Sequence, residues 1–404
     1  MADINVYLDK FQGVNNLLDP KDLTSNELTQ AINVDITRDG RIQSRPSWKY
    51  IRECEDGHSL WSDNINMYFV DGDNLIKKNP NGVEQIIDIG YKGLKTSFLK
   101  DVNNIIISND KFIKRFKNNK IYDIAPPTCT NEYDINFGLG GTFPIGKYQI
   151  AITYLFDDGI EGATRNAMQV EITQDNSSIV ISNLPVTFDS NITGYRLYLT
   201  EQNATTLRHY NDYGLVDSIT LNYNIQNFGK QLQFFNKDPI SPGSLIEKYK
   251  GVIFTAVGNK IYFSEPLEYL TKYNYLEFDG DITLLVAHID GIYVSDSYNV
   301  YWLSGSNPHD LNRIQVYNSP AIKYTQNKNI MTNDVFFYTQ TGQIIAESGG
   351  QIKNITEDKH LPNKELKEGA SLIMYQNGIK KIINSFKTGE SNSAGFGDWA
   401  KICD

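Results

Sequence analysis

The sequence predicts an all-β protein: a β-propeller of about six blades, interrupted by an inserted β-sandwich. Three observations predict this fold. A strand–turn–strand unit recurs along the chain, the copies are spaced by about one propeller blade, and one interval is long enough to hold a further domain. The chain has 404 residues, which is enough for two or three domains. Aromatic residues make up 12% of it, including 25 Tyr, and such residues favour strands.

The repeated unit consists of a short apolar strand, a tight turn rich in Gly, Asn or Asp, and a second strand. Six copies span Ile65–Lys78, Asn103–Phe116, Lys250–Pro266, Asp290–Gly305, Asn333–Ser348 and Gly369–Phe386. Five of them carry turn residues that accept a positive φ: Gly72-Asp73, Asn109-Asp110, Gly258-Asn259, Thr341-Gly342 and Asn377-Gly378. Because turn chemistry also determines the register of the flanking strands, each copy is predicted to be a β-hairpin.

The spacing of these turns predicts the architecture. Gly72 and Asn109 are 37 residues apart, and the turns after Gly258 follow at intervals of 38, 45 and 36 residues. A strand-built repeat of about 35–45 residues is typical of a propeller blade. The interval from Asn109 to Gly258 is 149 residues, which is too long for one blade and predicts an insertion.

The predicted insertion covers residues 128–238, between Ala125-Pro126-Pro127 and a second proline-rich border at Pro239–Pro242. Its short β-branched and aromatic strands are separated by frequent turn signals, as in a seven-stranded sandwich. The segment lacks the Cys–Trp–Cys pattern of antibody domains, so a fibronectin III-like module is expected.

The remaining boundaries follow from these assignments. Residues 1–50 are expected to form an N-terminal arm, residues 51–127 and 239–390 the two parts of the propeller, and residues 391–404 a C-terminal tail. Within the arm, the apolar spacing of Leu23–Asn33 predicts a short helix. Thr24 or Ser25 would cap it, and Glu27 would complete a capping box with Thr24. A strand pair is expected over 33–46.

The bulk charge excludes some functions. The net charge is −10 with a pI near 5.1, which argues against wrapping nucleic acid by neutralising phosphates.

Cys54, Cys129 and Cys403 lie far apart without a CxxC pair, which favours synthesis in a reducing compartment. No secretion signal is expected, and no apolar run approaches the length of a membrane span.

No catalytic, cofactor-binding or metal-binding residue is predicted, and no cofactor. The five histidines, His58, His209, His288, His309 and His360, show no metal-ligand spacing. His288 and Asp290 form either a catalytic pair or, as we favour, a pair at the surface edge of a strand. Acidic turns at 71–73, 157–159 and 279–281 suit either calcium or, as we favour, hairpin chemistry. Tyr301, Trp302 and Trp399 either stack on sugars or, as we favour, pack in the core or a subunit interface.

Two segments carry a resemblance to a known family. Phe11–Ile51 combines Gly13–Asn16, Glu27, Ala31, Asn33–Asp35, Asp39-Gly40 and Arg45-Pro46, and Gly258–Phe278 carries Ser264-Glu265-Pro266. Both resemble the tail nozzle proteins, or packaged-DNA stabilisation proteins, of short-tailed bacteriophages.

The resemblance implies a non-enzymatic structural virion protein, made in the host cytoplasm and built into the phage tail. It implies a homo-oligomeric ring of six subunits that closes and extends the DNA channel. The implied partners are a portal-adaptor ring, tail fibre or needle proteins, and packaged double-stranded DNA held in the lumen without sequence-specific binding. The channel-lining residues remain unknown at this level. The acidic composition predicts a neutral to acidic channel wall along which DNA slides.

Two other functions remain open. One is a tail or receptor-binding propeller that binds or hydrolyses glycans, which a cleft with converging carboxylates and exposed Trp would favour. The other is a cellular propeller scaffold for partner proteins.

Overall fold

The computed structural model describes residues 10–37, 39–45, 50–130, 132–222, 228–329, 332–361, 365–376 and 379–388. The chain divides into two compact units. One is Cys54–Glu277, and the other joins Met1–Glu53 to Phe278–Asp404. No helix of the described chain has both the length and the hydropathy of a membrane span.

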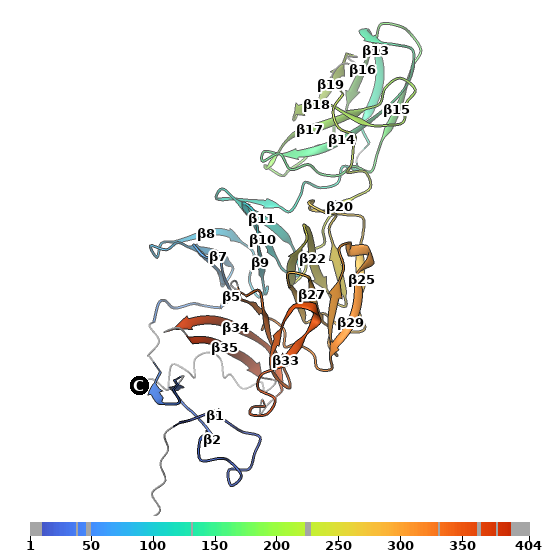
Figure 1. Ribbon diagram of the computed structural model, residues 1–404. Helices are drawn as coiled ribbons and strands as arrows, with labels where there is room; N and C mark the ends of the chain where they lie inside the picture. The colour runs from blue at the N-terminus through green and yellow to red at the C-terminus, as the bar shows by residue number, and fades with distance from the viewer. Residues whose placement is uncertain are drawn as a thin grey trace, which may run out of the picture. The chain divides into compact units, whose positions relative to one another are not determined.

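The unit Cys54–Glu277 contains three four-stranded antiparallel sheets whose strands follow one another in chain order (Figure 1). This meander is the form of a propeller blade. The strands of the three blades are β5 (Gly57–Ser62), β6 (Met67–Asp71), β7 (Asn74–Lys78) and β8 (Glu84–Ile89); β9 (Ser97–Asp101), β10 (Asn104–Ser108), β11 (Ile113–Lys117) and β12 (Lys120–Asp123); and β21 (Leu245–Tyr249), β22 (Val252–Val257), β23 (Lys260–Phe263) and β25 (Tyr275–Glu277). A short antiparallel pair links β20 (Asp238–Pro239), which precedes the third blade, to β24 (Leu270–Thr271), which lies between β23 and β25.

Each predicted hairpin in this unit forms the two central strands of a blade. Asp71 pairs with Asn74 across Gly72-Asp73, and Val257 pairs with Lys260 across Gly258-Asn259. Gly72 and Gly258 have φ values of 60° and 57°, the positive φ that favours Gly at these tight turns. These two hairpin predictions are confirmed together with their turn residues.

Neighbouring blades of this unit pack face to face. Val70 and Leu75 of the first blade meet Ile105, Ile107 and Phe116 of the second in one buried cluster. The opposite face of the second blade presents Ile106 and Ile113 to Ile246 and Ile253 of the third. A central strand is therefore buried on both sides, which explains its nearly continuous apolar sequence.

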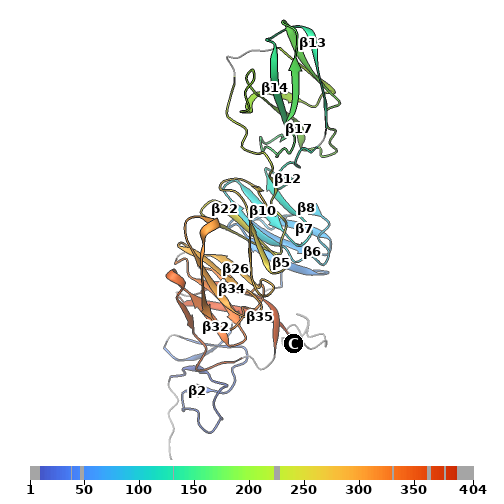
Figure 2. The same ribbon diagram turned by 90° about the vertical axis from the view of Figure 1, so that its right-hand side faces the viewer.

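The insertion between β12 and β20 is a two-sheet sandwich of seven strands (Figures 1 and 2). One sheet has the order β13-β16-β19 and the other β15-β14-β17-β18. The strands are β13 (Asp134–Phe143), β14 (Gly146–Phe156), β15 (Met168–Ile172), β16 (Ser177–Ser182), β17 (Ile192–Leu199), β18 (Arg208–Gly214) and β19 (Ser218–Leu221). Its core is apolar and aromatic, with Phe143, Tyr148, Ile150 and Ile179 fully buried.

The second unit holds two more blades, again as chain-ordered antiparallel meanders. Their strands are β26 (Leu284–Ala287), β27 (Gly291–Ser295), β28 (Val300–Ser304) and β29 (Asn312–Tyr317), then β30 (Asn327–Lys328), β31 (Val335–Thr339), β32 (Gly342–Ala346) and β33 (Ile352–Asn354), with 3-10 turns η2 (Pro308–Asp310) and η3 (Ser348–Gly350). Tyr293 and Trp302 of one blade pack against Phe337 and Ile344 of the next. The prediction of an all-β propeller with an inserted sandwich is confirmed. The fibronectin III-like type of the sandwich stays a prediction.

The sixth predicted hairpin differs from the others because it forms a two-stranded sheet. It pairs β34 (Leu366–Gln376) with β35 (Ile379–Thr388). Its predicted turn, Asn377-Gly378, lies outside the described residues. Leu366 and Phe386 pack on Ile322 and Tyr338 of the preceding blade, which supplies the support that an isolated hairpin lacks. Of the six predicted hairpins, five therefore lie in four-stranded blades and the sixth forms a two-stranded ribbon.

The N-terminal arm contains strands where a helix was predicted. Glu27–Leu28 is a short strand, β2, that pairs in parallel with β1 (Gly13–Val14). One of the predicted capping-box contacts exists, since the Thr24 amide donates to the Glu27 carboxylate at 3.4 Å, but it closes a turn, and the Thr24 hydroxyl donates to the same carboxylate at 3.1 Å. Eleven residues with few apolar positions are too short to hold a helix without packing. The strand pair expected over 33–46 is confirmed as β3 (Val34–Ile36) and β4 (Ile42–Ser44).

Two predicted turns also need correction. The β10–β11 connection is a four-residue loop, and Asn109 is not among the residues with positive φ. Instead the buried Asn109 side chain accepts hydrogen bonds from the amides of Lys111 and Phe112 at 2.9 and 3.0 Å. In the fifth blade Thr339 pairs with Gly342, so the turn is Gln340-Thr341, one residue earlier than predicted.

Candidate functional site

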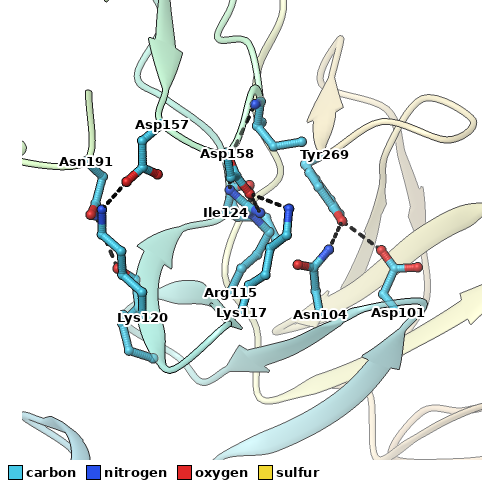
Figure 3. A network of polar contacts seen from close by, with 12 residues as sticks. Asp101, Asn104, Arg115, Lys117, Lys120, Ile124, Asp157, Asp158, Asn191 and Tyr269 are labelled. Carbon is cyan, nitrogen blue, oxygen red and sulfur yellow. Dashed lines mark hydrogen bonds and ion pairs between the residues drawn. The ribbon is translucent and has the colours of Figure 1, made fainter. Parts of the chain in front are cut away.

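The sandwich is joined to the second blade by a largely buried network of ion pairs (Figure 3). Arg115 of β11 is fully buried, and its Nε donates to the Ile124 carbonyl at 2.9 Å. Its Nη1 lies 2.8 Å from the Asp158 carboxylate, which belongs to the turn after β14 of the sandwich. Lys117 reaches the same carboxylate at 3.1 Å. Two cations from one blade strand therefore bind one anion of the sandwich.

The environment of this pair explains its protonation state. Burial acts to raise the pKa of Asp158, but hydrogen bonds from Arg115 and Lys117 and the positive charge of Arg115 outweigh it, so the pKa is lowered. The Arg115 guanidinium also lies over the rings of Tyr122, Phe156 and Tyr269, with centroid distances of 5.1, 5.8 and 5.3 Å. Paired charges and aromatic faces together compensate for the burial of Arg115.

Further contacts flank this network. Lys120 forms an ion pair with Asp157, and the Asn191 amide donates to the Ile121 carbonyl at 3.2 Å. On the side of the third blade, Tyr269 donates to Asp101 at 2.8 Å. Figure 3 shows these groups on either side of Arg115. The insertion is thus held by side chains of the second blade in addition to its two chain connections, and Tyr269 ties the third blade to the same blade.

A cleft of about 590 Å³ lies beside this junction, between the sandwich and the third blade. Glu161 and Arg196 are its central charged groups. The Glu161 carboxylate accepts hydrogen bonds from Thr153 at 2.7 Å and Tyr198 at 2.6 Å, and from Arg196 at 2.8 Å. Arg196 also holds Asp212 through two bonds of 2.8 Å, and His209 contacts Asp212 at 2.9 Å.

The chemistry available to the cleft follows from these bonds. Glu161 accepts three hydrogen bonds, and Arg196 bridges its carboxylate to that of Asp212, so the charged side chains of the cleft are tied to one another. The described residues contain no group of three or more His, Cys, Asp or Glu side chains placed to hold a metal. Phe234 and Tyr269 line the cleft as aromatic walls.

The residues singled out from the sequence are dispersed. His288 does contact Asp290, at 2.7 Å, but its side chain is buried, so the expected surface pair is wrong in that respect. The pair is structural, because Asp290 also accepts from the Gly349 amide at 2.8 Å. Tyr301 and Trp302 are buried in the core, as favoured, whereas Trp399 and the tail lie outside the described residues.

The acidic turns act as backbone anchors and ion-pair partners. Asp71 accepts from the Glu55 and Asp56 amides at 2.8 and 3.2 Å, and Asp73 accepts from the Lys92 amide at 3.1 Å. Asp157 and Asp158 form the junction ion pairs described above. The turn assignment is therefore confirmed for Asp71–Asp73 and extended by an interdomain role for Asp157 and Asp158.

Glu161, Arg196 and Asp212 were not singled out from the sequence. Arg196 and Tyr198 occupy alternate positions of β17, which places them on one face of the sheet. Such alternation was a detectable signal that the two side chains lie on the sheet face opposite the sandwich core. The pairing of Arg196 with Glu161, 35 residues earlier, was not detectable, because it depends on how the loop after β14 folds back.

No family model matches this chain, and no curated protein matches it. Solved structures that are similar include BBS1N in complex with ARL6DN, at 10% identity and a TM-score of 0.33, covering 83% of this chain and 89% of that one. The Pan2 WD40 domain of Neurospora crassa has 10% identity and a TM-score of 0.31, and the match covers 78% of this chain and 82% of that one. Apo AztD from Citrobacter koseri has 10% identity to this chain and a TM-score of 0.28, and the match covers 74% of this chain and 85% of that one. At these TM-scores the likenesses carry no argument, and the β-propeller fold rests on the sheets described above.

Proposed function

We propose that this chain is a non-enzymatic structural protein of a short-tailed phage virion. In this proposal identical subunits form the ring-shaped tail nozzle, close and extend the DNA channel, retain packaged DNA and release it on infection. The proposal rests on the motifs in Phe11–Ile51 and Gly258–Phe278 and on the architecture of blades interrupted by a sandwich.

The observation that carries the proposal is the buried clamp at the junction. Arg115 and Lys117 bind Asp158, and their side chains are 0%, 26% and 6% exposed, respectively. An insertion on a flexible tether would need no such clamp. A tail component that withstands DNA under pressure requires its domains to be fixed to one another, and this clamp supports that role.

The direct test is electron microscopy of the purified full-length protein, alone and mixed with a portal-adaptor ring. Rings with a central channel, formed by heterologous contacts between identical subunits, are the expected result. A protein that remains monomeric at every concentration, with and without the adaptor, would refute the proposal. A channel wall rich in Lys and Arg in the assembled ring would refute the sliding mechanism but not the ring.

A second candidate function is glycan binding at the cleft, which Phe234, Tyr269 and the exposed Gln231 and Gln233 favour. The candidate is restricted to binding, since the Glu161 carboxylate of the cleft is engaged by Thr153, Tyr198 and Arg196. Saturation-transfer NMR with host surface polysaccharide tests it. Binding lost in Tyr269→Ala but retained in Tyr273→Ala would support a glycan role at this cleft.

A further inference from the structure

The loop between β16 and β17 of the sandwich presents a fully exposed aromatic side chain. Phe188 is 100% exposed and Val186 is 76% exposed, so neither side chain packs against the rest of the chain. Single exposed apolar residues are common on protein surfaces, but aromatic residues are enriched where proteins contact one another. We call the segment Val186–Asp189 the apolar knob.

The backbone on both sides of the apolar knob is anchored. Before it, the Pro185 carbonyl accepts hydrogen bonds from the Tyr195 hydroxyl at 2.8 Å and from the Tyr154 hydroxyl at 3.4 Å. After the aromatic ring, Asp189 Oδ1 accepts from the Asn191 amide at 2.9 Å. A segment that is already held in place loses less conformational entropy when it binds a partner. The knob is therefore preorganised for a contact.

The cleft beside the junction has an apolar wall that is also uncovered. Leu267 lines this cleft, is 86% exposed and has a φ of 62°. Its amide donates to the Gly251 carbonyl at 2.8 Å, which helps to fix this backbone. A positive φ is strained in a bulky residue, and such strain concentrates at functional sites. Together with Phe234 and Tyr269, Leu267 gives the cleft three large apolar walls.

The charges of the apolar knob and the cleft are complementary. Lys230 lines the cleft, is exposed and has no carboxylate within ion-pair distance among the described residues. The other carboxylates and guanidinium of the cleft are paired with one another or, for Glu268, with Lys237. Asp189 follows Phe188 directly and has no cation within ion-pair distance in the described part of the chain. A knob seated in the cleft would bring these two charges together.

We propose that the apolar knob of one subunit inserts into the cleft of a second copy of this chain. Phe188 packs against the apolar walls of that cleft, and Asp189 pairs with its Lys230. The knob does not fill its own cleft, because no knob residue lines it and Phe188 is fully exposed.

This contact joins two different surfaces of identical chains, so it is heterologous. Heterologous contacts form rings when the rotation between subunits closes, and filaments when it does not. The inference rests on the proposed function in that it names the contact by which subunits of the tail nozzle join. An occupied cleft has no room for a glycan, so in the assembled protein this contact and the glycan candidate exclude each other.

The first test is sedimentation velocity of the full-length protein over a range of concentrations. Phe188→Ser is expected to weaken self-association about tenfold or more. Leu139→Ser is the matched control, because Leu139 is 77% exposed on β13 of the same sandwich and should leave association unchanged. Rings that persist unchanged in Phe188→Ser would overturn this contact and leave the proposed nozzle ring standing. A native protein that is monomeric at every concentration would overturn both.

The second test exchanges the two charges. Lys230→Glu places a carboxylate opposite Asp189 and should weaken self-association, and adding Asp189→Lys to the same chain should restore it. Asp189→Asn keeps the acceptor for the Asn191 amide, so it should weaken association without disturbing the loop. Circular dichroism verifies that each variant folds. Association that is unchanged in Lys230→Glu and in Asp189→Asn would overturn the pairing.

The third test separates a heterologous contact from any other. Phe188→Ser retains the cleft and Leu267→Asp retains the apolar knob, so neither variant alone should assemble. Their equimolar mixture should form dimers with one chain of each kind and nothing larger, which native mass spectrometry measures. A mixture that stays monomeric, or rings of Leu267→Asp alone, would overturn the proposal. Host polysaccharide that binds the cleft without weakening self-association would also overturn it.

Discussion

At the scale of single residues, the junction depends on a few buried charges. Arg115 is fully buried and the Asp158 side chain is 6% exposed, so neither charge is solvated by water and each depends on the other. A buried ion pair of this kind adds little net stability over an apolar pair, but removing one partner leaves the other charge uncompensated.

Asp158→Asn is therefore expected to destabilise the protein by about 3–5 kcal/mol. Denaturant unfolding followed by tryptophan fluorescence and far-UV circular dichroism measures the change. The control is Glu171→Gln, which removes an exposed partner of Lys147 on the same sandwich at 4.0 Å and should cost about 1 kcal/mol or less. Equal losses in both variants would mean that the junction pair is not buried in solution.

The lowered pKa of Asp158 predicts that the free energy of unfolding depends on pH. Because the pKa of Asp158 is lowered in the folded state, its contribution to stability is present above the unfolded pKa of about 3.9 and is lost as the pH falls through the lower folded pKa. The unfolding free energy of the native protein should thus fall more steeply below pH 4 than that of Asp158→Asn. Parallel acid profiles for the two proteins would contradict the assignment.

At the scale of elements, the blades use buried Asp or Asn side chains to close four-residue loops. Asp296 is fully buried and accepts from the Tyr298 and Asn299 amides at 2.8 Å each. Asn109 caps the equivalent loop of the second blade, and Asp63 caps a four-residue loop between β5 and β6 of the first. In each case a side-chain oxygen satisfies backbone amides that the strand ladder leaves unpaired.

Asp296→Ala is expected to cost about 2–3 kcal/mol, since two loop amides and the Tyr301 hydroxyl lose their buried acceptor. Thermal unfolding by calorimetry measures it. Asp279→Ala is the matched control, because Asp279 is exposed in the same unit and should leave the melting temperature nearly unchanged. If the two variants melt at the same temperature, the loop does not depend on the cap.

The positions of strands could be predicted from the sequence where a strand is buried on both of its faces. The predicted hairpins of the five blades are their central strands, because burial on both faces leaves continuous apolar runs. Outer strands such as β8 and β29 are mostly exposed and were not predicted, since a solvated edge places few constraints on sequence. The helix predicted at Leu23–Asn33 was wrong because its backbone pairs with β1, a contact that local propensity does not contain.

At the scale of the whole molecule, the insertion is predicted to be an autonomous domain. Its core residues, including Phe143, Ile150 and Ile179, come almost entirely from its own seven strands. A fragment of residues 128–238 should therefore fold alone and unfold cooperatively, as dispersed amide NMR signals and a sigmoidal denaturation curve would demonstrate. A disordered fragment would place the domain boundary elsewhere or show that the clamp is required for folding.

The sequence by itself determined the fold class and the place of the inserted sandwich. Strand periodicity, turn chemistry and repeat spacing are local properties, and each is written in neighbouring residues. Only the tertiary structure brought together Arg115 with Asp158 and Arg196 with Glu161. Those contacts join residues from different strands and loops, and their energy depends on burial and distance, which no linear pattern records.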